Sequence, residues 1–223
     1  MPPEQAWQTA ENHFNRGRYN RAAPYYQQLV FDRTSVYVAE AQFKLGESYF
    51  RRRGRDYYVD AIFEFQEFLR LFPDHRLAAD AQFRIGQAYV RISLPAELTQ
   101  EDSHRAIDNF IRFIERFPLD PRISQANQYI MEMQIKQIEK TYLTGYIYFK
   151  MRDFPAAALY LNEIIALGNR NELEKNAMYY IARIHIDRRE IDEALVALEH
   201  LQRHFPDSRE TNRIEKRFQR RRF

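Results

Sequence analysis

The chain contains no cysteine and few glycines and prolines, with 6 Gly and 9 Pro among its 223 residues. The absence of cysteine excludes disulfide bonds, thiolate zinc sites and cysteine nucleophiles. No apolar run approaches the roughly 18 residues of a membrane-spanning helix, and the first residues lack the basic and apolar stretches of a signal peptide. With 45% hydrophobic residues and prolines clustered at predicted boundaries, the sequence favours an all-helical protein over a β fold.

The sequence also lacks a large excess of charge of either sign, because its formal net charge is only +3. Nucleic-acid-binding domains are often more basic, so we expect no nucleic-acid partner. Arginine supplies 28 of the 34 basic residues. Its planar donor group suits carboxylates, so this composition is compatible with acidic protein partners, although a compositional bias of the genome would give the same pattern.

A repeated pair of helices organises the chain, and the stretch from Ala39 to Pro73 is its clearest copy. Gly46 in the first helix and Ala61 in the second mark the point where two helices must approach closely. The same small residues recur at a spacing of 12 in Ala10–Ala22, Gly145–Ala157 and Ala182–Ala194, and the alanine precedes a closing proline by 12 in Ala61–Pro73, Ala106–Pro118 and Ala194–Pro206. A bulky residue follows each alanine by four positions, as Tyr26, Phe65, Phe110, Leu161 and Leu198. This pattern is typical of tetratricopeptide (TPR) repeats, whose period is about 34 residues.

We therefore predict an all-α fold, a right-handed TPR-type solenoid of five helix-pair units. The expected helices cover residues 4–16, 20–32, 39–49, 60–71, 123–151, 154–166, 172–187, 191–205 and 210 to about 222, with a third pair between residues 77 and 118. The long helix 123–151 lies between units 3 and 4, and the last helix is expected to cap the solenoid, with a basic end that can also contact an acidic surface or phospholipid head groups. Two connections are expected to be long, at residues 51–58 and 92–104, and Thr99 is expected to cap the following helix.

We expect two halves with different roles. Residues 1–118 would hold three units and a peptide-binding groove, and residues 119–223 would hold the long helix, two units, the capping helix and a partner-docking surface.

No motif for catalysis or metal binding is present. Among the six histidines only His200 and His204 share a helix face, and two histidines without an acidic third ligand make a poor metal site. The sequence has neither a glycine-rich phosphate loop nor a recognisable Ser-His-Asp arrangement. We predict a protein that is not an enzyme and that needs no cofactor or metal.

Aromatic residues recur on the first helix of every unit. Three positions before the small residue stand Trp7, Phe43, Phe83, Tyr142 and Tyr179, and four positions after it stand Phe14, Phe50, Val90, Phe149 and Ile186. Because first helices line the concave face of such arrays, we predict an apolar strip that binds an extended peptide. The groove residues expected are Trp7, Phe14, Phe43, Phe50, Arg51, Phe83, Arg84 and Arg91, with the arginines holding a carboxylate. The alternative is that these aromatic residues serve helix packing alone.

Two further details narrow the repeat family. Three helices end in the pairs Phe72-Pro73, Phe117-Pro118 and Phe205-Pro206, and the long link through Thr99 to Asp102 precedes the segment Arg105 to Phe110 and the long helix. Over roughly Glu4 to Thr211 the chain resembles the BamD family of outer-membrane-assembly lipoproteins.

The resemblance implies a non-enzymatic subunit of the β-barrel assembly machinery at the periplasmic face of the bacterial outer membrane. It implies binding to the periplasmic domains of BamA, to accessory Bam lipoproteins, and to the C-terminal signal peptides of unfolded outer-membrane proteins. It also implies a lipid anchor on an N-terminal cysteine that this sequence lacks, so the chain would be a soluble form of an anchored precursor. Within the family the N-terminal repeats are associated with the signal peptide and the C-terminal ones with BamA. We therefore expect the BamA-binding surface of this chain to lie between Tyr142 and Phe205.

Two other functions remain open. One is a different TPR adaptor that binds peptides in the periplasm or cytosol; adaptors for chaperone tails usually need Lys and Asn in the groove, whereas this chain has Phe43 and Glu47 there. The other is an RNA-binding repeat protein, suggested by the runs of arginine.

Overall fold

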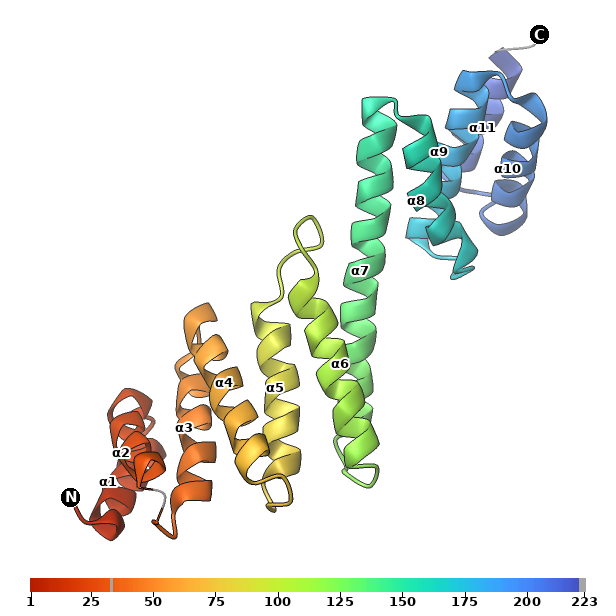
Figure 1. Cartoon of the computed structure of the whole chain (residues 1–223). Helices are drawn as coiled ribbons and strands as arrows, with labels where there is room; N and C mark the ends of the chain where they lie inside the picture. Colours follow the sequence, from red (N-terminus) through yellow and green to blue (C-terminus); the bar gives the residue numbers. More distant parts are fainter. Residues whose placement is uncertain (33, 221–223) are drawn as a thin grey trace. The chain divides into compact units, whose positions relative to one another are not determined.

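The computed structural model describes residues 1–32 and 34–220, which form eleven α-helices and no strand (Figure 1). The helices are α1 (Pro3–Asn15), α2 (Tyr19–Phe31), α3 (Val38–Arg52), α4 (Arg55–Leu71), α5 (Ala78–Ile92), α6 (Glu101–Arg116), α7 (Ile123–Met151), α8 (Phe154–Ala166), α9 (Glu172–Arg188), α10 (Ile191–His204) and α11 (Arg209–Arg220). The predicted all-α architecture of TPR-type helix pairs is confirmed. The number of repeat units stays a prediction, and the predicted end of the last helix lies outside the described residues.

The small residues of the repeat lie where helices touch. Every alanine of the pattern is completely buried, and Gly46, Gly86 and Gly145 are buried as well. A Cβ atom on Gly46 would lie only 2.8 Å from the Phe65 ring, and one on Gly86 would lie 2.8 Å from the Phe110 ring. The bulky residue of the second helix therefore packs directly against the backbone of the first, as the spacing predicts.

The first connection that we expected to be long is short. Helix α3 continues to Arg52 and α4 begins at Arg55, so only two residues join them. These two adopt positive φ values, 55° at Arg53 and 128° at Gly54. The Arg52 guanidinium lies 3.8 Å from the centre of the Tyr57 ring and donates a hydrogen bond to the Tyr57 hydroxyl, which holds the turn closed.

The second long connection is present, between α5 and α6, but its cap differs from the prediction. Helix α6 begins after Gln100, and Thr99 makes no cap. Instead the Gln100 amide donates to the Pro95 carbonyl at 2.8 Å, and the Ser103 hydroxyl donates to the Gln100 side-chain oxygen at 2.8 Å. Part of this loop, including Ala96 and Gln100, is buried rather than exposed.

The chain divides into two compact units, one of Met1–Pro95 with Thr99–Ile135 and one of Ala96–Leu98 with Lys136–Phe223. The division falls inside α7 and not after residue 118, where we expected it. The reason is packing, because Ala126 and Met133 of α7 are completely buried in the cores of the first unit, Ala126 in the one that contains Phe110 and Phe113. The predicted long helix itself is confirmed with the predicted ends.

The second unit has one core, built from the end of α7 and from α8 to α10, with Leu161, Ile184 and Leu201 fully buried. Two helices start with side-chain caps: Asp153 accepts from the Ala156 amide and Asn171 from the Glu174 amide. Helix α11 buries Thr211 and Ile214 against this core and leaves most of its other side chains exposed. That is the arrangement expected of a cap on a helical repeat.

Candidate functional site

Phe43 and Phe83, two of the predicted groove residues, lie inside the helix packing. They are 8% and 4% exposed, and the Phe43 ring centre lies 5.4 Å from that of Phe65. The Phe83 ring lies 5.1 Å from that of Phe113. Residues three positions apart share one helix face, so Phe43 faces the same neighbour as Gly46. The prediction that these two rings line an open apolar strip is therefore wrong.

Trp7 is only partly buried, and aromatic neighbours hold it on two sides. Its ring stacks on Tyr37 with centres 5.1 Å apart and planes at 10°. Tyr26 approaches edge-on at 5.8 Å. One face of the indole is therefore occupied by the protein itself.

Phe14 and Phe50 are half-buried and carry cations over their rings. The Lys44 ammonium lies 4.4 Å from the centre of the Phe14 ring, and the Arg51 guanidinium lies 5.4 Å from it. The Arg84 guanidinium lies 4.9 Å from the centre of Phe50. These contacts are of the cation–π type, so the surface at these positions is a mixture of rings and charges rather than a purely apolar strip.

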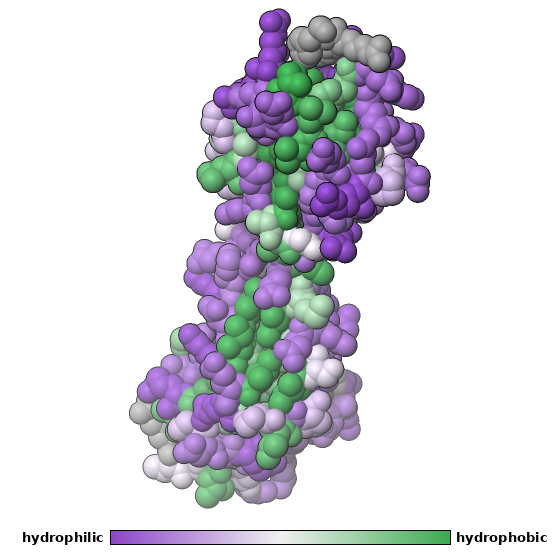
Figure 2. All heavy atoms as spheres, turned by 90° about the vertical axis from the view of Figure 1, so that its right-hand side faces the viewer, coloured by the Kyte–Doolittle hydropathy of each residue, from purple (hydrophilic) through white to green (hydrophobic). Residues whose placement is uncertain are grey.

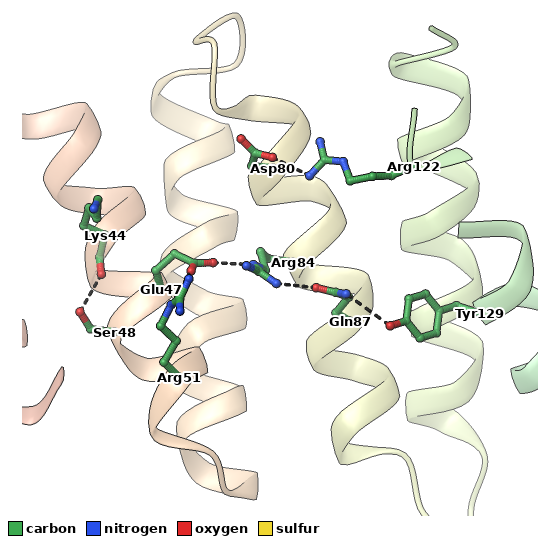
Figure 3. A network of polar contacts seen from close by, with 9 residues as sticks. All are labelled: Lys44, Glu47, Ser48, Arg51, Asp80, Arg84, Gln87, Arg122 and Tyr129. Carbon is green, nitrogen blue, oxygen red and sulfur yellow. Dashed lines mark hydrogen bonds and ion pairs between the residues drawn. The ribbon is translucent and has the colours of Figure 1, made fainter. Parts of the chain in front are cut away.

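Side chains of α3, α5 and α7 in the first unit join in a chain of polar contacts, which Figure 3 shows. We call this chain the polar ladder; its members are Glu47, Arg51, Arg84, Gln87 and Tyr129. Glu47 accepts from Arg51 at 3.0 Å and from Arg84 at 2.5 Å, and Glu11 of α1 forms a separate pair with Lys44 of α3 at 3.1 Å. Arg84 also donates to Gln87 at 2.8 Å, and Gln87 donates to the Tyr129 hydroxyl at 3.3 Å.

The polar ladder changes what two predicted site residues can do. Arg51 and Arg84 were expected to hold a carboxylate of a ligand, but Glu47 already supplies one to both. Its side chain is only 6% exposed, so the ion pairs are partly shielded from water. Arg91 differs from them, because it is exposed near the end of α5. A ligand carboxylate would have to displace Glu47 or use Arg91.

Arg122 is a contributor that the sequence did not reveal. It lies just before α7 and pairs with Asp80 at 2.5 Å and with Asp120 at 2.7 Å. Its guanidinium also lies over the Phe83 ring, 5.0 Å from the centre. The hydrogen bonds from Arg122 lower the pKa of Asp120. Asp120 is a near neighbour in the sequence, but Asp80 lies 42 positions from Arg122 and only the fold brings these two together.

A cavity of about 480 Å³ opens between α2, α3 and α4, away from the predicted groove. Its lining includes Val30, Phe31, Phe63, Leu71 and Glu64. Phe31 and Phe63 are 77% and 61% exposed. Burial raises the pKa of Glu64, whose carboxylate accepts a hydrogen bond from the Gln42 amide at 2.5 Å. The predicted groove follows the first helices of the repeats, whereas much of the lining of this cavity comes from the second helices α2 and α4.

In the second unit the corresponding aromatic residues form one cluster. Phe149 and Ile186 are buried, whereas Tyr142 and Tyr179 are partly exposed. The Tyr180 ring lies 4.8 Å from Phe149 and 5.2 Å from Tyr146. Burial raises the pKa of Tyr142 well above its usual range.

His200 and His204 lie side by side on α10, with ring centres 4.6 Å apart. Glu174 of α9 lies 3.1 Å from the Nε2 atom of His200, a neighbour that the sequence spacing did not reveal. Burial and the nearby His200 lower the pKa of His204. Across residues 1–32 and 34–220 no three His, Cys, Asp or Glu side chains are grouped as metal ligands would be.

Comparison with known proteins identifies a family. The sequence profile of an outer membrane lipoprotein family, YfiO, matches residues 1–175, and a tetratricopeptide repeat profile matches residues 176–208. No curated protein matches the chain. In the part of the chain that the structure describes, no helix is long and apolar enough to cross a membrane.

Solved structures with similar helix arrangements include two of MamA, both 16% identical in sequence. The first alignment covers 99% of this chain and 96% of the MamA chain, with a TM-score of 0.40. The second covers 95% of this chain and 96% of the MamA chain, with a TM-score of 0.37. A tetratricopeptide repeat protein from Parabacteroides merdae is 11% identical, with coverage of 97% and 98% and a TM-score of 0.28. The family profile spans most of the chain, and the protein therefore belongs to the YfiO, or BamD-like, family of outer membrane lipoproteins and contains a tetratricopeptide repeat.

Proposed function

We propose that the protein is a non-enzymatic scaffold subunit of the machinery that assembles β-barrels in the outer membrane, and that its second unit docks on the periplasmic domains of BamA. The observation that carries this proposal is the family match over residues 1–175. Large apolar side chains on the second unit support it, since Leu159 and Val196 are 65% and 67% exposed. Figure 2 shows apolar surface on this unit bordered by hydrophilic atoms, which is common at protein interfaces.

The proposal includes a location and further partners. In the native precursor a lipid-modified cysteine would hold the protein at the periplasmic face of the outer membrane, where accessory Bam lipoproteins would also reach it. Mass spectrometry of the protein isolated from membranes tests this directly. A mass without attached acyl chains would contradict the anchor.

A peptide-binding role for the first unit keeps part of the predicted groove. Trp7, Phe14 and Phe50 are partly exposed there, and Arg91 is exposed near the end of α5. Partly exposed rings beside a cation suit the C-terminal segment of an unfolded barrel protein, which has an aromatic side chain and a terminal carboxylate. Phe43 and Phe83 stabilise the helix packing beneath the groove and do not contact the peptide.

Binding to BamA is tested by calorimetric titration of its periplasmic domains into the protein. Leu195→Glu and Val196→Glu place charge on the exposed face of α10, where the side chains are 43% and 67% exposed. We expect either change to weaken binding at least about tenfold, because a buried charge without a partner is costly at an interface. Phe63→Glu, at a residue of the first unit that is 61% exposed, is the matched control and should leave the affinity unchanged. Equal loss in all three variants would contradict docking through the second unit.

The peptide role has a separate test. A labelled peptide that ends in phenylalanine is titrated into the wild type and into Phe14→Ala, Phe50→Ala and Arg91→Gln, with thermal melting as a check on folding. An affinity about tenfold weaker in a variant that melts normally supports the groove, because the aromatic or ion-pair contacts of one side chain contribute on that scale. Unchanged affinity in all three variants contradicts it without affecting the BamA proposal.

A further inference from the structure

A cavity of about 450 Å³ lies in the second unit and is strongly basic. It is lined by Phe149, Lys150, Arg152, Phe154, Arg183, Asp187 and Arg217, which come from α7, α8, α9 and α11 and from the turn after α7. Four of these seven side chains are basic and one is acidic. The volume falls in the range of sites that hold a side chain or small ligand.

The one acidic side chain neutralises little of this charge. Asp187 pairs with Arg217 at 2.8 Å. Within residues 1–32 and 34–220, no carboxylate lies within ion-pair distance of Lys150, Arg152 or Arg183. Three cations therefore face the same cavity without a carboxylate partner among the described side chains.

Arg183 packs against aromatic rings in this cavity. Its guanidinium lies 4.8 Å from the centre of the Phe149 ring and 5.7 Å from that of Tyr179. Its Nε atom is buried and has no hydrogen-bond acceptor within the described residues, so a ligand in the cavity would meet the terminal nitrogens of the guanidinium.

The favourable effect of a cation at a helix end does not explain Arg183. Lys150 stands in the last turn of α7, where the helix dipole favours a positive charge. Arg183 stands further from the end of α9, which runs to Arg188. The dipole effect fades within the last turn, so the position of Arg183 needs another cause.

We propose that this cavity binds a carboxylate of a protein partner, with the terminal nitrogens of the Arg183 guanidinium donating and Lys150 and Arg152 supplying further positive charge. Contact with aromatic rings fixes the plane of the guanidinium, so its in-plane donors are already oriented for the two oxygens of a carboxylate. The recess and its two phenylalanines suit a single side chain or chain end of a protein better than the flat array of head groups on a membrane. The site would serve any acidic partner, so it does not depend on BamA.

Fluorescence anisotropy with three labelled peptides tests the proposal and identifies the source of the carboxylate. Each peptide has a central residue with a leucine on either side, and eight glycine and serine residues surround this segment. The first has a central glutamate and an amidated end, the second a central glutamine and a free end, and the third a central glutamine and an amidated end. We expect the first or the second to bind about tenfold tighter than the third, as one charge-assisted contact provides. Equal binding of all three, or binding of none, would overturn the proposal.

Variants separate the pocket from general attraction between opposite charges. Arg183→Lys keeps the charge but loses the planar donors, and we expect about tenfold weaker binding of the preferred peptide. Arg203→Gln removes one exposed cation from α10, outside the cavity, and should leave affinity unchanged. Equal loss in these two variants, or tighter binding of inorganic phosphate or of phosphatidylglycerol vesicles than of the peptide, would contradict a carboxylate site.

A second variant guards against a folding defect at Arg183. Arg152 adopts a φ of 63°, a conformation that glycine accepts without strain, so Arg152→Gly removes a cation while preserving the turn. We expect binding to fall several-fold and the melting temperature to stay the same or rise. Unchanged peptide affinity in Arg152→Gly together with unchanged affinity in Arg183→Lys would sink the proposal.

Discussion

The two units place opposite charges at the same point of the repeat. In α3 the residue after the small Gly46 is Glu47, and in α9 the residue after the small Ala182 is Arg183. Glu47 is satisfied by two arginines of its own unit. Arg183 has aromatic rings beside it, but no described side chain or backbone group accepts from its buried Nε atom. The helix spacing fixes where this side chain lies, while its charge is free to differ.

The contrast extends to a second pair of groups. The first unit contains Glu64, a partly buried carboxylate that accepts from an amide and has no ion pair within the described residues. The second unit contains Arg183, a cation in the converse situation. Glu64 and Arg183 are thus two partly buried charges of opposite sign that lack an ion pair within the described residues.

The largest expected effect comes from making the first unit resemble the second. Glu47→Arg would place a third cation beside Arg51 and Arg84 in a position that is 6% exposed. We expect the free energy of unfolding, measured with urea, to fall by about 3 kcal/mol, because a buried pair is replaced by repulsion. Glu115→Arg on exposed α6 is the control and should change stability by less than about 0.5 kcal/mol. A small effect of Glu47→Arg would mean that the polar ladder contributes little to folding.

A somewhat smaller effect is expected at the close helix contacts. Gly46→Ala would bring a Cβ atom to 2.8 Å from the Phe65 ring, and we expect a loss of about 2 kcal/mol in unfolding free energy. Phe65→Leu should restore part of this loss, so the double variant should cost less than the sum of the single ones. Gly145→Ala gives the comparison in the second unit, where Leu161 lies 2.9 Å away. If the losses of unfolding free energy of the two single variants simply add in the double variant, the Phe65 ring does not restrict residue 46.

The smallest expected effect concerns pH and the first unit. Burial raises the pKa of Glu64 in the folded state. The folded protein therefore binds this proton more tightly than the unfolded chain, and the associated stability is present below about pH 4.3 and lost as the pH rises through the raised pKa. Glu64→Gln should thus raise the urea midpoint at pH 8 and leave it nearly unchanged at pH 4. The gain should stay below about 1 kcal/mol because water screens a half-exposed group; a loss at pH 8 would contradict the assignment.

Periodicity carried most of the fold prediction. Small residues and rings at fixed spacing identify the helix pairs, since a contact between two helices needs both a gap and a group that fills it. The long helix followed from the absence of proline between Ile123 and Met151. The tight turn after Arg52 did not follow, because it depends on an arginine that stacks on Tyr57 across the turn.

The candidate site was harder to predict for a geometric reason. Aromatic residues at helical spacing mark one face of a helix but do not say whether another helix covers it, and at Phe43 and Phe83 it does. Charge partners such as Glu47 with Arg84 lie 37 positions apart in the sequence and are joined only by the fold. The basic cavity of the second unit likewise combines side chains from four helices and a turn, which no local pattern relates.

Trp7 has an optical consequence. It is the single tryptophan of the chain, and it stacks on Tyr37, the residue before α3. Excitation at the red edge of its absorption band therefore follows the separation of α1 from its neighbours, whereas the 15 tyrosines report on the whole molecule. Recording both emissions during one denaturation would reveal whether the N-terminal pair detaches before the remainder melts.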